Sequence, residues 1–384
     1  MSLIFENTAL AATQEQTHAL VIGVGDYPHL LGGSLFASQP AASTLGLGQL
    51  TSSIHSATAF ANWLIKNYKN DQAPLGSLEL LLSPAASNYK LPDGTFKQVD
   101  AATTPHIQAA FNNWYTRAGT MDKNVAIFYF CGHGIESDVT LLLPEDFGSN
   151  PNNLWDNAID FNSTWYGMGE CKAQTQCYFL DCCRETPIDL LKTKQVNARS
   201  LKSTSQLQFP ERDAYVLRAA PVGKKAHGPA NSMSFFTEGL LECFEGLGAS
   251  HKDGAKWKIT TDSLTAAMVR LMKRKKLPNG LRGSCAKGGE SNFTTEIHEI
   301  SGAVKVMAAI VCDPAAALGH ATLSMNSGVP PPLTRAPLPE AWEFEVEVGS
   351  YVVEAQFANA PYSNKTEKAV IAPPYSPVTL KVKP

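Results

Sequence analysis

The chain has 384 residues, of which 44% are hydrophobic and 17% charged, and its formal net charge is −3. This length predicts one large domain with a smaller one, or two to three domains, and the composition excludes global disorder. The small net charge argues against a surface built to bind nucleic acid or a membrane, so neither is expected as a partner.

The cysteine pattern favours reduced thiols. The eight cysteines contain no CxxC pair, and Cys182 and Cys183 are adjacent, which is a poor arrangement for ordinary disulfides. We therefore expect a cytoplasmic location. Residues 1–16 lack the basic region of a signal peptide, and no apolar run approaches the roughly 18 residues of a membrane span. The chain shows no zinc spacing and no complete dinucleotide motif, so no metal and no cofactor are expected.

The first part of the chain contains predicted strands and helices in alternation. Residues 17–24 are an apolar run typical of a central strand, and residues 52–68 carry apolar side chains at helical spacing. A short strand at residues 78–82 follows. Thr104 is suited to capping a helix that has Pro105 at its first position.

Two further apolar strands each lead into a reactive residue. Residues 124–131 lead into the tripeptide GHG around His133, and residues 176–180 lead into the pentapeptide DCCRE around Cys183. Such runs are typical of strands buried on both faces of a parallel sheet, where the functional crevice lies at the carboxyl ends. The separation of 183 − 133 = 50 positions leaves room for the crossover between parallel neighbours. We therefore expect the two side chains to meet at this edge.

His133 and Cys183 are the candidate catalytic residues. A thiolate is a strong nucleophile, and a nearby histidine can accept its proton and later protonate the leaving amine. The alternative is a loop histidine and a structural cysteine, since free cysteines are usually buried. The two motifs at this spacing favour the catalytic interpretation. Strand alternation places neighbouring side chains on opposite faces, so we expect Cys182 to pack into the core.

The GHG and Cys-Arg motifs resemble the caspase superfamily of cysteine peptidases, for which this spacing is known. The leading Asp181 is closer to the Asp-x-Cys of metacaspases and paracaspases, and prokaryotic caspase-like proteins are the nearest group in this resemblance. The family nucleophile lies two residues after the leading Asp, which selects Cys183. The resemblance covers roughly residues 17–300. It implies an α/β caspase-hemoglobinase fold, with a mostly parallel central sheet flanked by helices.

The resemblance also implies roles for the residues around the dyad. The oxyanion hole is expected to consist of the backbone N–H groups of Gly134 and Cys183. Asp181 is expected in the S1 pocket, where it would bind Arg or Lys at P1 through a charge-assisted contact. The chain departs from this pattern at two places. Ser53 lies near the position where relatives carry Asp-Ala, and His227 lies near the position where relatives often carry a further acidic residue. The alternative for Asp181 is a strand-end residue that bonds to local backbone.

The resemblance divides residues 1–301 into parts of one catalytic domain. Residues 17–185 match the large subunit, and residues 214–301 match the small subunit. Between them, residues 186–213 carry lysines, an arginine and serines among few apolar anchors, which predicts an exposed linker. In many caspases the matching segment is cut on activation, so we expect a zymogen that is processed there.

The final residues, 302–384, predict a separate domain. Several strands with alternating polarity and a Gly-Ser hairpin turn indicate a small all-β sandwich. We expect this sandwich to serve as an accessory domain.

These observations predict a cysteine endopeptidase that cleaves protein or peptide substrates through a Cys-His dyad. An activating protease or a regulatory partner is expected, and the resemblance implies a role in signalling, cell death or antiviral defence. One alternative is a catalytically silent caspase-like module that binds a partner, against which the intact His133 and Cys183 argue. Another is a Cys-His hydrolase or acyltransferase that does not cut proteins. Many metacaspases require calcium, but the sequence shows no clear calcium site.

Overall fold

The computed structural model describes residues 1–36, 46–150, 152–185, 197–206, 208–277, 280, 282–328, 331–358 and 361–383. The chain divides into two compact units, Met1–Leu241 with Met268–Ile297 and Glu242–Ala267 with His298–Pro384. The predicted division at residue 301 differs from these units, since the second unit also takes residues from 242 onward. The reason is that β12 (Ala249–Asp253) and β13 (Lys256–Thr260) form a sheet with β15 (Glu296–Ser301).

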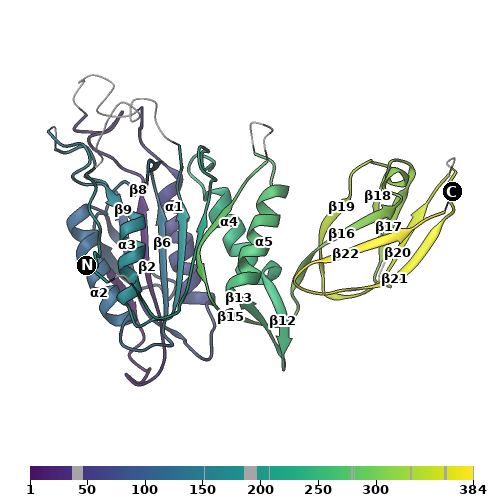
Figure 1. The fold of residues 1–384 in the computed structure, drawn as a ribbon, viewed down its shortest axis with the longest axis horizontal. Helices are drawn as coiled ribbons and strands as arrows, with labels where there is room; N and C mark the ends of the chain where they lie inside the picture. The colour runs from purple at the N-terminus through teal and green to yellow at the C-terminus, as the bar shows by residue number, and fades with distance from the viewer. Residues whose placement is uncertain are drawn as a thin grey trace. The chain divides into compact units, whose positions relative to one another are not determined.

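The first unit is built on a seven-stranded sheet in the order β1-β3-β2-β6-β10-β11-β14. Its five inner strands run parallel, and only the edge strands β1 and β14 are antiparallel (Figure 1), which confirms the predicted mostly parallel sheet. The strands are β1 Leu3–Glu6, β2 Thr17–Val24, β3 Leu75–Ser83, β6 Val125–Cys131, β10 Thr175–Asp181, β11 Asp213–Arg218 and β14 Ala286–Ser291.

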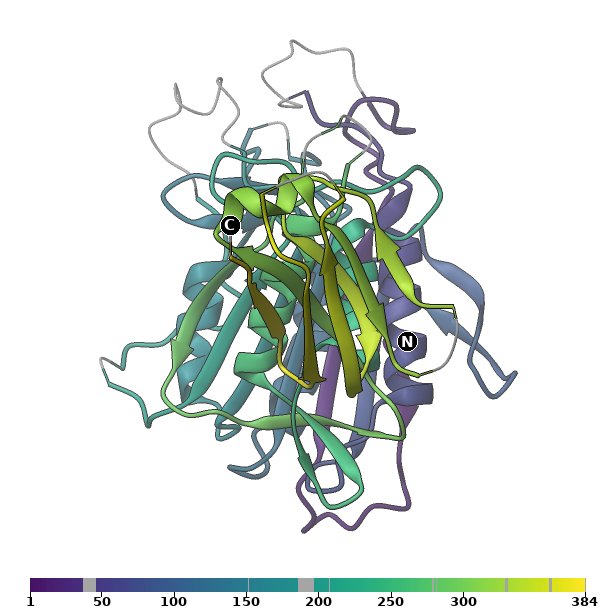
Figure 2. The same ribbon diagram turned by 90° about the vertical axis from the view of Figure 1, so that its right-hand side faces the viewer.

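Every residue of β2, β6 and β10 is buried because helices cover both faces of the sheet (Figures 1 and 2). On one face Phe60 of α1 stacks on Tyr129 with ring centroids 4.8 Å apart. On the other face Trp114 of α2 lies 6.1 Å from Phe128, the preceding residue of the same strand. The helices are α1 Ser52–Asn67, α2 Thr104–Ala118, α3 Phe161–Gly167 and the 3-10 helix η1 Met168–Glu170.

Short strands complete the loops of this unit. β4 (Ala86–Lys90) and β5 (Phe96–Val99) form a hairpin. A three-stranded sheet follows the GHG tripeptide and consists of β7 Gly134–Glu136, β8 Thr140–Leu142 and β9 Ile159–Asp160. In this small sheet β7 leaves His133, and β8 returns beside it.

Two helices span the divisions between the residue ranges of the units. They are α4 (Phe235–Glu242) and α5 (Thr261–Arg274). The π-helix η3 (Cys243–Leu247) continues α4 directly. Asp262 lies inside the first turn of α5.

The rest of the second unit is a β-sandwich. One sheet has the order β19-β16-β22 and the other β18-β17-β20-β21 (Figure 1). Side chains of both sheets share one apolar core. The elements are β16 Lys305–Asp313, the 3-10 helix η4 Ala315–His320, β17 Thr322–Asn326, β18 Leu333–Arg335, β19 Trp342–Glu347, β20 Gly349–Gln356, β21 Lys365–Ile371 and β22 Ser376–Lys381.

The segment before β11 differs from the predicted exposed linker. Residues 186–196 and 207 lie outside the described residues. Residues 197–206 and 208–212, here called the anchored segment, are mostly exposed or half-buried, but a few of them attach the segment to the rest of the first unit. Leu201 is 5% exposed and joins the main core, and Arg212 is 3% exposed with its guanidinium over the ring of Trp165. Lys202 pairs with Glu170 at 2.5 Å. The prediction of exposure is therefore wrong for these anchor residues.

A substitution at Leu201 tests this anchoring. We expect Leu201→Ala to lower the free energy of unfolding by about 2–5 kcal/mol, because it removes buried apolar contacts and leaves a cavity. The control Val222→Ala removes a side chain that is 63% exposed and should change this free energy by less than about 0.5 kcal/mol. Urea unfolding measures both. Equal stability of the two variants would show that Leu201 does not anchor the segment.

Candidate active site

The pairing of β6 with β10 brings the two motifs together. The strands are parallel and in register from Val125 and Thr175 to Cys131 and Asp181. His133 and Cys183 each follow two residues after the last pair, at the carboxyl ends of neighbouring strands. The Gly132 N–H donates to the Asp181 carbonyl at 3.4 Å, which continues the pairing past the strand ends.

Tyr27 holds the backbone around His133. This tyrosine is fully buried, and its hydroxyl accepts from the His133 N–H at 2.7 Å and donates to the Leu143 carbonyl at 3.1 Å. Its ring lies 4.8 Å from the imidazole, measured between centroids. The Leu143 N–H donates to the His133 carbonyl at 3.1 Å. Both backbone groups of His133 are thus engaged, and one face of its ring is packed.

The carbonyl of Gly48 determines which imidazole nitrogen carries the proton. His133 Nε2 lies 2.7 Å from this oxygen. A carbonyl only accepts hydrogen bonds, so the neutral ring has its proton on Nε2 and its free lone pair on Nδ1. Burial lowers the pKa of His133, and the Gly48 carbonyl opposes this by favouring the charged form. The ring is therefore neutral at neutral pH and has a basic nitrogen.

The thiol of Cys183 lies against the loop that follows β11. Its Sγ accepts from the Ala226 N–H at 3.3 Å and lies 3.9 Å from the Ala226 carbonyl oxygen. Burial raises the pKa of Cys183, and the Ala226 N–H acts in the opposite direction. Backbone hydrogen bonds from Arg184 N–H to the Lys224 carbonyl and from Gly223 N–H to the Arg184 carbonyl hold the same loop. Cys182 is 2% exposed and belongs to the core.

Gly134 lies where backbone segments approach closely. A Cβ atom at this position would come within 2.6 Å of Cys182 Sγ and 2.7 Å of the Cys183 carbonyl oxygen. Since His133 and Leu143 form a hydrogen-bonded pair, the next pair, Gly134 and Leu142, is of the non-hydrogen-bonded type. The Gly134 N–H therefore points out of the β7–β8 ladder. A glycine is required here by the contact with the cysteine segment.

Asp181 is buried and surrounded by hydroxyl groups. Its Oδ2 accepts from Ser234 Oγ at 2.5 Å, from Thr237 Oγ1 at 2.7 Å and from the Tyr129 hydroxyl at 3.2 Å. Burial raises the pKa of this carboxyl, and the hydroxyl donors oppose the rise. These partners are side chains distant in sequence, so the simple alternative of bonding to local backbone does not describe this residue.

Sequence reasoning missed several residues that shape the site. Gly48 acts through its carbonyl oxygen, and Ala226 acts through its backbone, so neither side chain carries a signal. Tyr27 gives a weak signal as an aromatic residue in the turn that leaves the first central strand. Ser234 bonds to Asp181 and also caps α4 by accepting from the Thr237 N–H at 3.0 Å.

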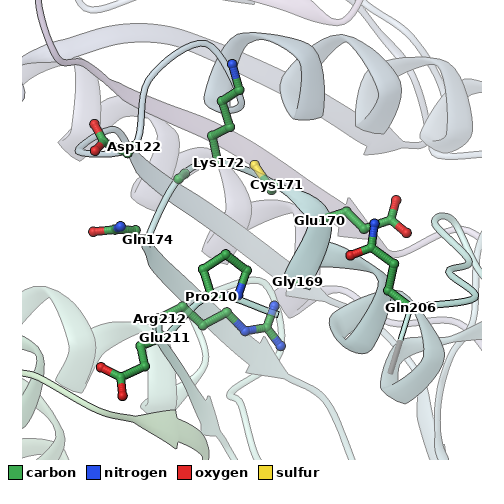
Figure 3. Close-up of a pocket in the computed structure, with 11 residues that line it drawn as sticks. Asp122, Gly169, Glu170, Cys171, Lys172, Gln174, Gln206, Pro210, Glu211 and Arg212 are labelled. Atoms are coloured by element: carbon green, nitrogen blue, oxygen red, sulfur yellow. The ribbon is translucent and has the colours of Figure 1, made fainter. Parts of the chain in front are cut away.

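A cavity of about 340 Å³ lies in another part of the first unit (Figure 3). Gln174 and Arg212 line it and directly precede β10 and β11, so it lies at the amino ends of these strands, opposite to His133 and Cys183. Its lining mixes both charge signs, including Asp122, Lys172 and Glu211. This cavity is separate from the candidate dyad.

Two kinds of feature are absent from the described residues. These residues contain no group of three or more His, Cys, Asp or Glu side chains arranged to hold a metal ion. In the same part of the chain, no helix has the length and apolar character that crossing a membrane would require.

Comparison with known proteins identifies what the chain is similar to. Residues 16–279 match the family model described as the caspase domain. An uncharacterized protein y4kE from Sinorhizobium fredii is 26% identical over 245 residues, which is 62% of this chain and 70% of that protein. The crystal structure of caspase-1 from Spodoptera frugiperda aligns with a TM-score of 0.43 and 9% identity, and covers 74% of this chain and 90% of that chain.

The pKa shifts predict how the reactivity of Cys183 depends on pH. Burial raises the pKa of the thiol and lowers that of the imidazole, so both groups are uncharged at neutral pH. We expect alkylation of Cys183 by iodoacetamide to accelerate steadily with rising pH, as the thiolate forms. A fast plateau between about pH 5 and 8, the sign of a preformed thiolate–imidazolium pair, would contradict this expectation. Mass spectrometry locates the adduct, and Cys183→Ala is the control.

Proposed function

The chain belongs to the caspase-domain family, and we propose that it is a cysteine endopeptidase that hydrolyses peptide bonds through His133 and Cys183. The observation that carries the proposal is the in-register parallel pairing of β6 and β10, which ends beside both residues. The hydrogen bond from His133 Nε2 to Gly48 supports it further, because it leaves Nδ1 as the basic nitrogen.

The proposed reaction proceeds through a thioester. Nδ1 of His133 accepts the thiol proton as Cys183 Sγ attacks the substrate carbonyl. The N–H groups of Gly134 and Cys183 donate to the oxyanion that develops. The imidazolium then protonates the leaving amine, and His133 activates the water that hydrolyses the thioester. The Ala226 N–H stabilises negative charge on the sulfur as the thiolate forms and again when the thiolate leaves during hydrolysis of the thioester.

Basic P1 specificity is part of the proposal and rests on Asp181. Three hydroxyls share its Oδ2, and among the described residues no cationic side chain hydrogen-bonds to the carboxylate. A buried carboxylate with a raised pKa gains when a cation approaches it. An arginine or lysine side chain at P1 would supply this charge.

The remaining parts of the proposal concern regulation. We infer a zymogen that an activating protease, the enzyme itself or a regulatory partner converts, with cleavage within residues 186–196. The proposed setting is a signalling, cell-death or defence cascade, in the cytoplasm. Family membership supports this setting.

Two adjacent thiols allow a matched test of the nucleophile. We expect Cys183→Ala and His133→Ala each to lower kcat/KM by at least about 10³-fold, because each removes a reacting group. Cys182→Ala removes the neighbouring core thiol and should retain most activity in its folded fraction. Fluorogenic peptides with Arg, Lys or Asp at P1 measure the rates. Activity in Cys183→Ala together with loss of activity in Cys182→Ala would overturn the assignment of Cys183 as the nucleophile. If no peptide-based thiol probe labels the wild type, the chain is better described as a catalytically silent module.

A second substitution tests the specificity. Asp181→Asn keeps the shape of the side chain but removes its charge, so we expect kcat/KM for Arg at P1 to fall about 30-fold or more. Hydrolysis of a peptide with the uncharged Gln at P1 is the comparison and should change much less. If the wild type prefers Asp at P1, Asp181 does not select a basic P1 residue. The same holds if kcat/KM falls by the same factor for the Arg and the Gln peptide in the variant.

A further inference from the structure

We propose that Glu136 and Arg184 form a positioning pair, which holds Cys183 in place relative to the backbone that follows His133. The inference rests on the proposed function and deepens it. Neither residue is proposed to touch the substrate. They act through the two segments that carry the nucleophile and the Gly134 N–H.

The pair has the geometry of a rigid clamp. Arg184 Nε donates to Glu136 Oε2 at 2.8 Å, and Nη2 donates to Oε1 at 2.6 Å. The side chains are only 12% and 14% exposed. A planar guanidinium with two parallel hydrogen bonds fixes direction as well as distance, which a lysine cannot do. Thr140 of β8 also donates to Glu136 Oε2 at 3.0 Å and holds the carboxylate in place.

The clamp joins two segments that have little other pairing. Glu136 is the last residue of β7, two residues after Gly134, and Arg184 follows Cys183 directly. Between these segments lies an isolated bridge, Ile135 with Glu185, in which the Glu136 N–H donates to the Glu185 carbonyl at 3.2 Å. Beyond Glu185 the chain leaves the described residues. The ion pair is therefore well placed to fix the spacing of the dyad.

The neighbouring Arg218 makes the loss of Glu136 more harmful than the loss of Arg184. Burial lowers the pKa of Arg218, and Arg184 lowers it further, whereas Glu136 raises it. The buried Arg218 Nε has no hydrogen-bond partner within the described part of the chain. Loss of the Glu136 charge removes the negative charge that offsets the repulsion between Arg184 and Arg218. Loss of Arg184 still leaves the Glu136 carboxylate the positive charge of Arg218, so we expect a smaller displacement of the segment that carries Cys183.

The test compares conservative variants in the full chain. We expect Glu136→Gln to lower kcat about 100-fold, and Arg184→Lys about 10-fold, with KM within about threefold, because small displacements of reacting groups reduce the rate strongly. The matched control Glu170→Gln removes the carboxylate of another partly buried ion pair, with Lys202, and should leave kcat unchanged. A merely structural role would lower the melting temperature without changing kcat per active site. Thiol labelling of Cys183 measures the concentration of active sites.

Three outcomes decide the inference. A kcat within twofold of wild type in both clamp variants overturns it, and so does a larger loss in Arg184→Lys than in Glu136→Gln. If Glu136→Gln does not fold, Glu136→Asp serves in its place, since it keeps the charge and shortens the arm. If the wild type cleaves no peptide even after a protease has cut it within residues 186–196, the proposed function fails. The clamp is then judged by the alkylation rate of Cys183, which must change at least fivefold in Glu136→Gln but not in Glu170→Gln.

Discussion

The in-register pairing of β6 and β10 is the constraint on which the candidate site depends. Seven consecutive residue pairs, from Val125 with Thr175 to Cys131 with Asp181, bring both strands to the same edge. A shift by one position would turn each strand's core side chains to the other face. Because Phe128 and Tyr129 pack against helices on opposite faces, the core itself opposes such a shift. The positions of His133 and Cys183 are thus a consequence of core packing.

Backbone groups make many of the contacts with His133 and Cys183 at this edge. The Gly48 carbonyl selects the imidazole tautomer, the Ala226 N–H contacts the sulfur, and the Gly134 N–H points out of its ladder. Such groups are fixed by the path of the chain, so they are preorganised before a substrate arrives. In the proposed reaction, the side chains at the site need only supply the proton acceptor, the nucleophile and a buried carboxylate.

The sequence predicted the central strands well because their apolar runs are continuous. It also predicted that His133 and Cys183 follow the carboxyl ends of neighbouring strands, because parallel strands end at one edge. It did not predict the contacts of Tyr27 and Gly48, since these join residues about 100 positions apart through a hydroxyl and a carbonyl. The sequence also did not predict that the anchored segment is attached to the core, because the composition of this segment is polar. There a single apolar residue, Leu201, and an arginine stacked on Trp165 provide the attachment.

The anchored segment has a consequence for a chain broken between residues 185 and 197. β10 and β11 hydrogen-bond along six residue pairs, and they belong to opposite sides of such a break. Leu201 and Arg212 stay in the core beside helices of the other fragment. The two fragments would share one sheet and one core, so they would separate under denaturing conditions but migrate as a single particle in native solution. Size alone would then not distinguish the intact protein from the nicked one.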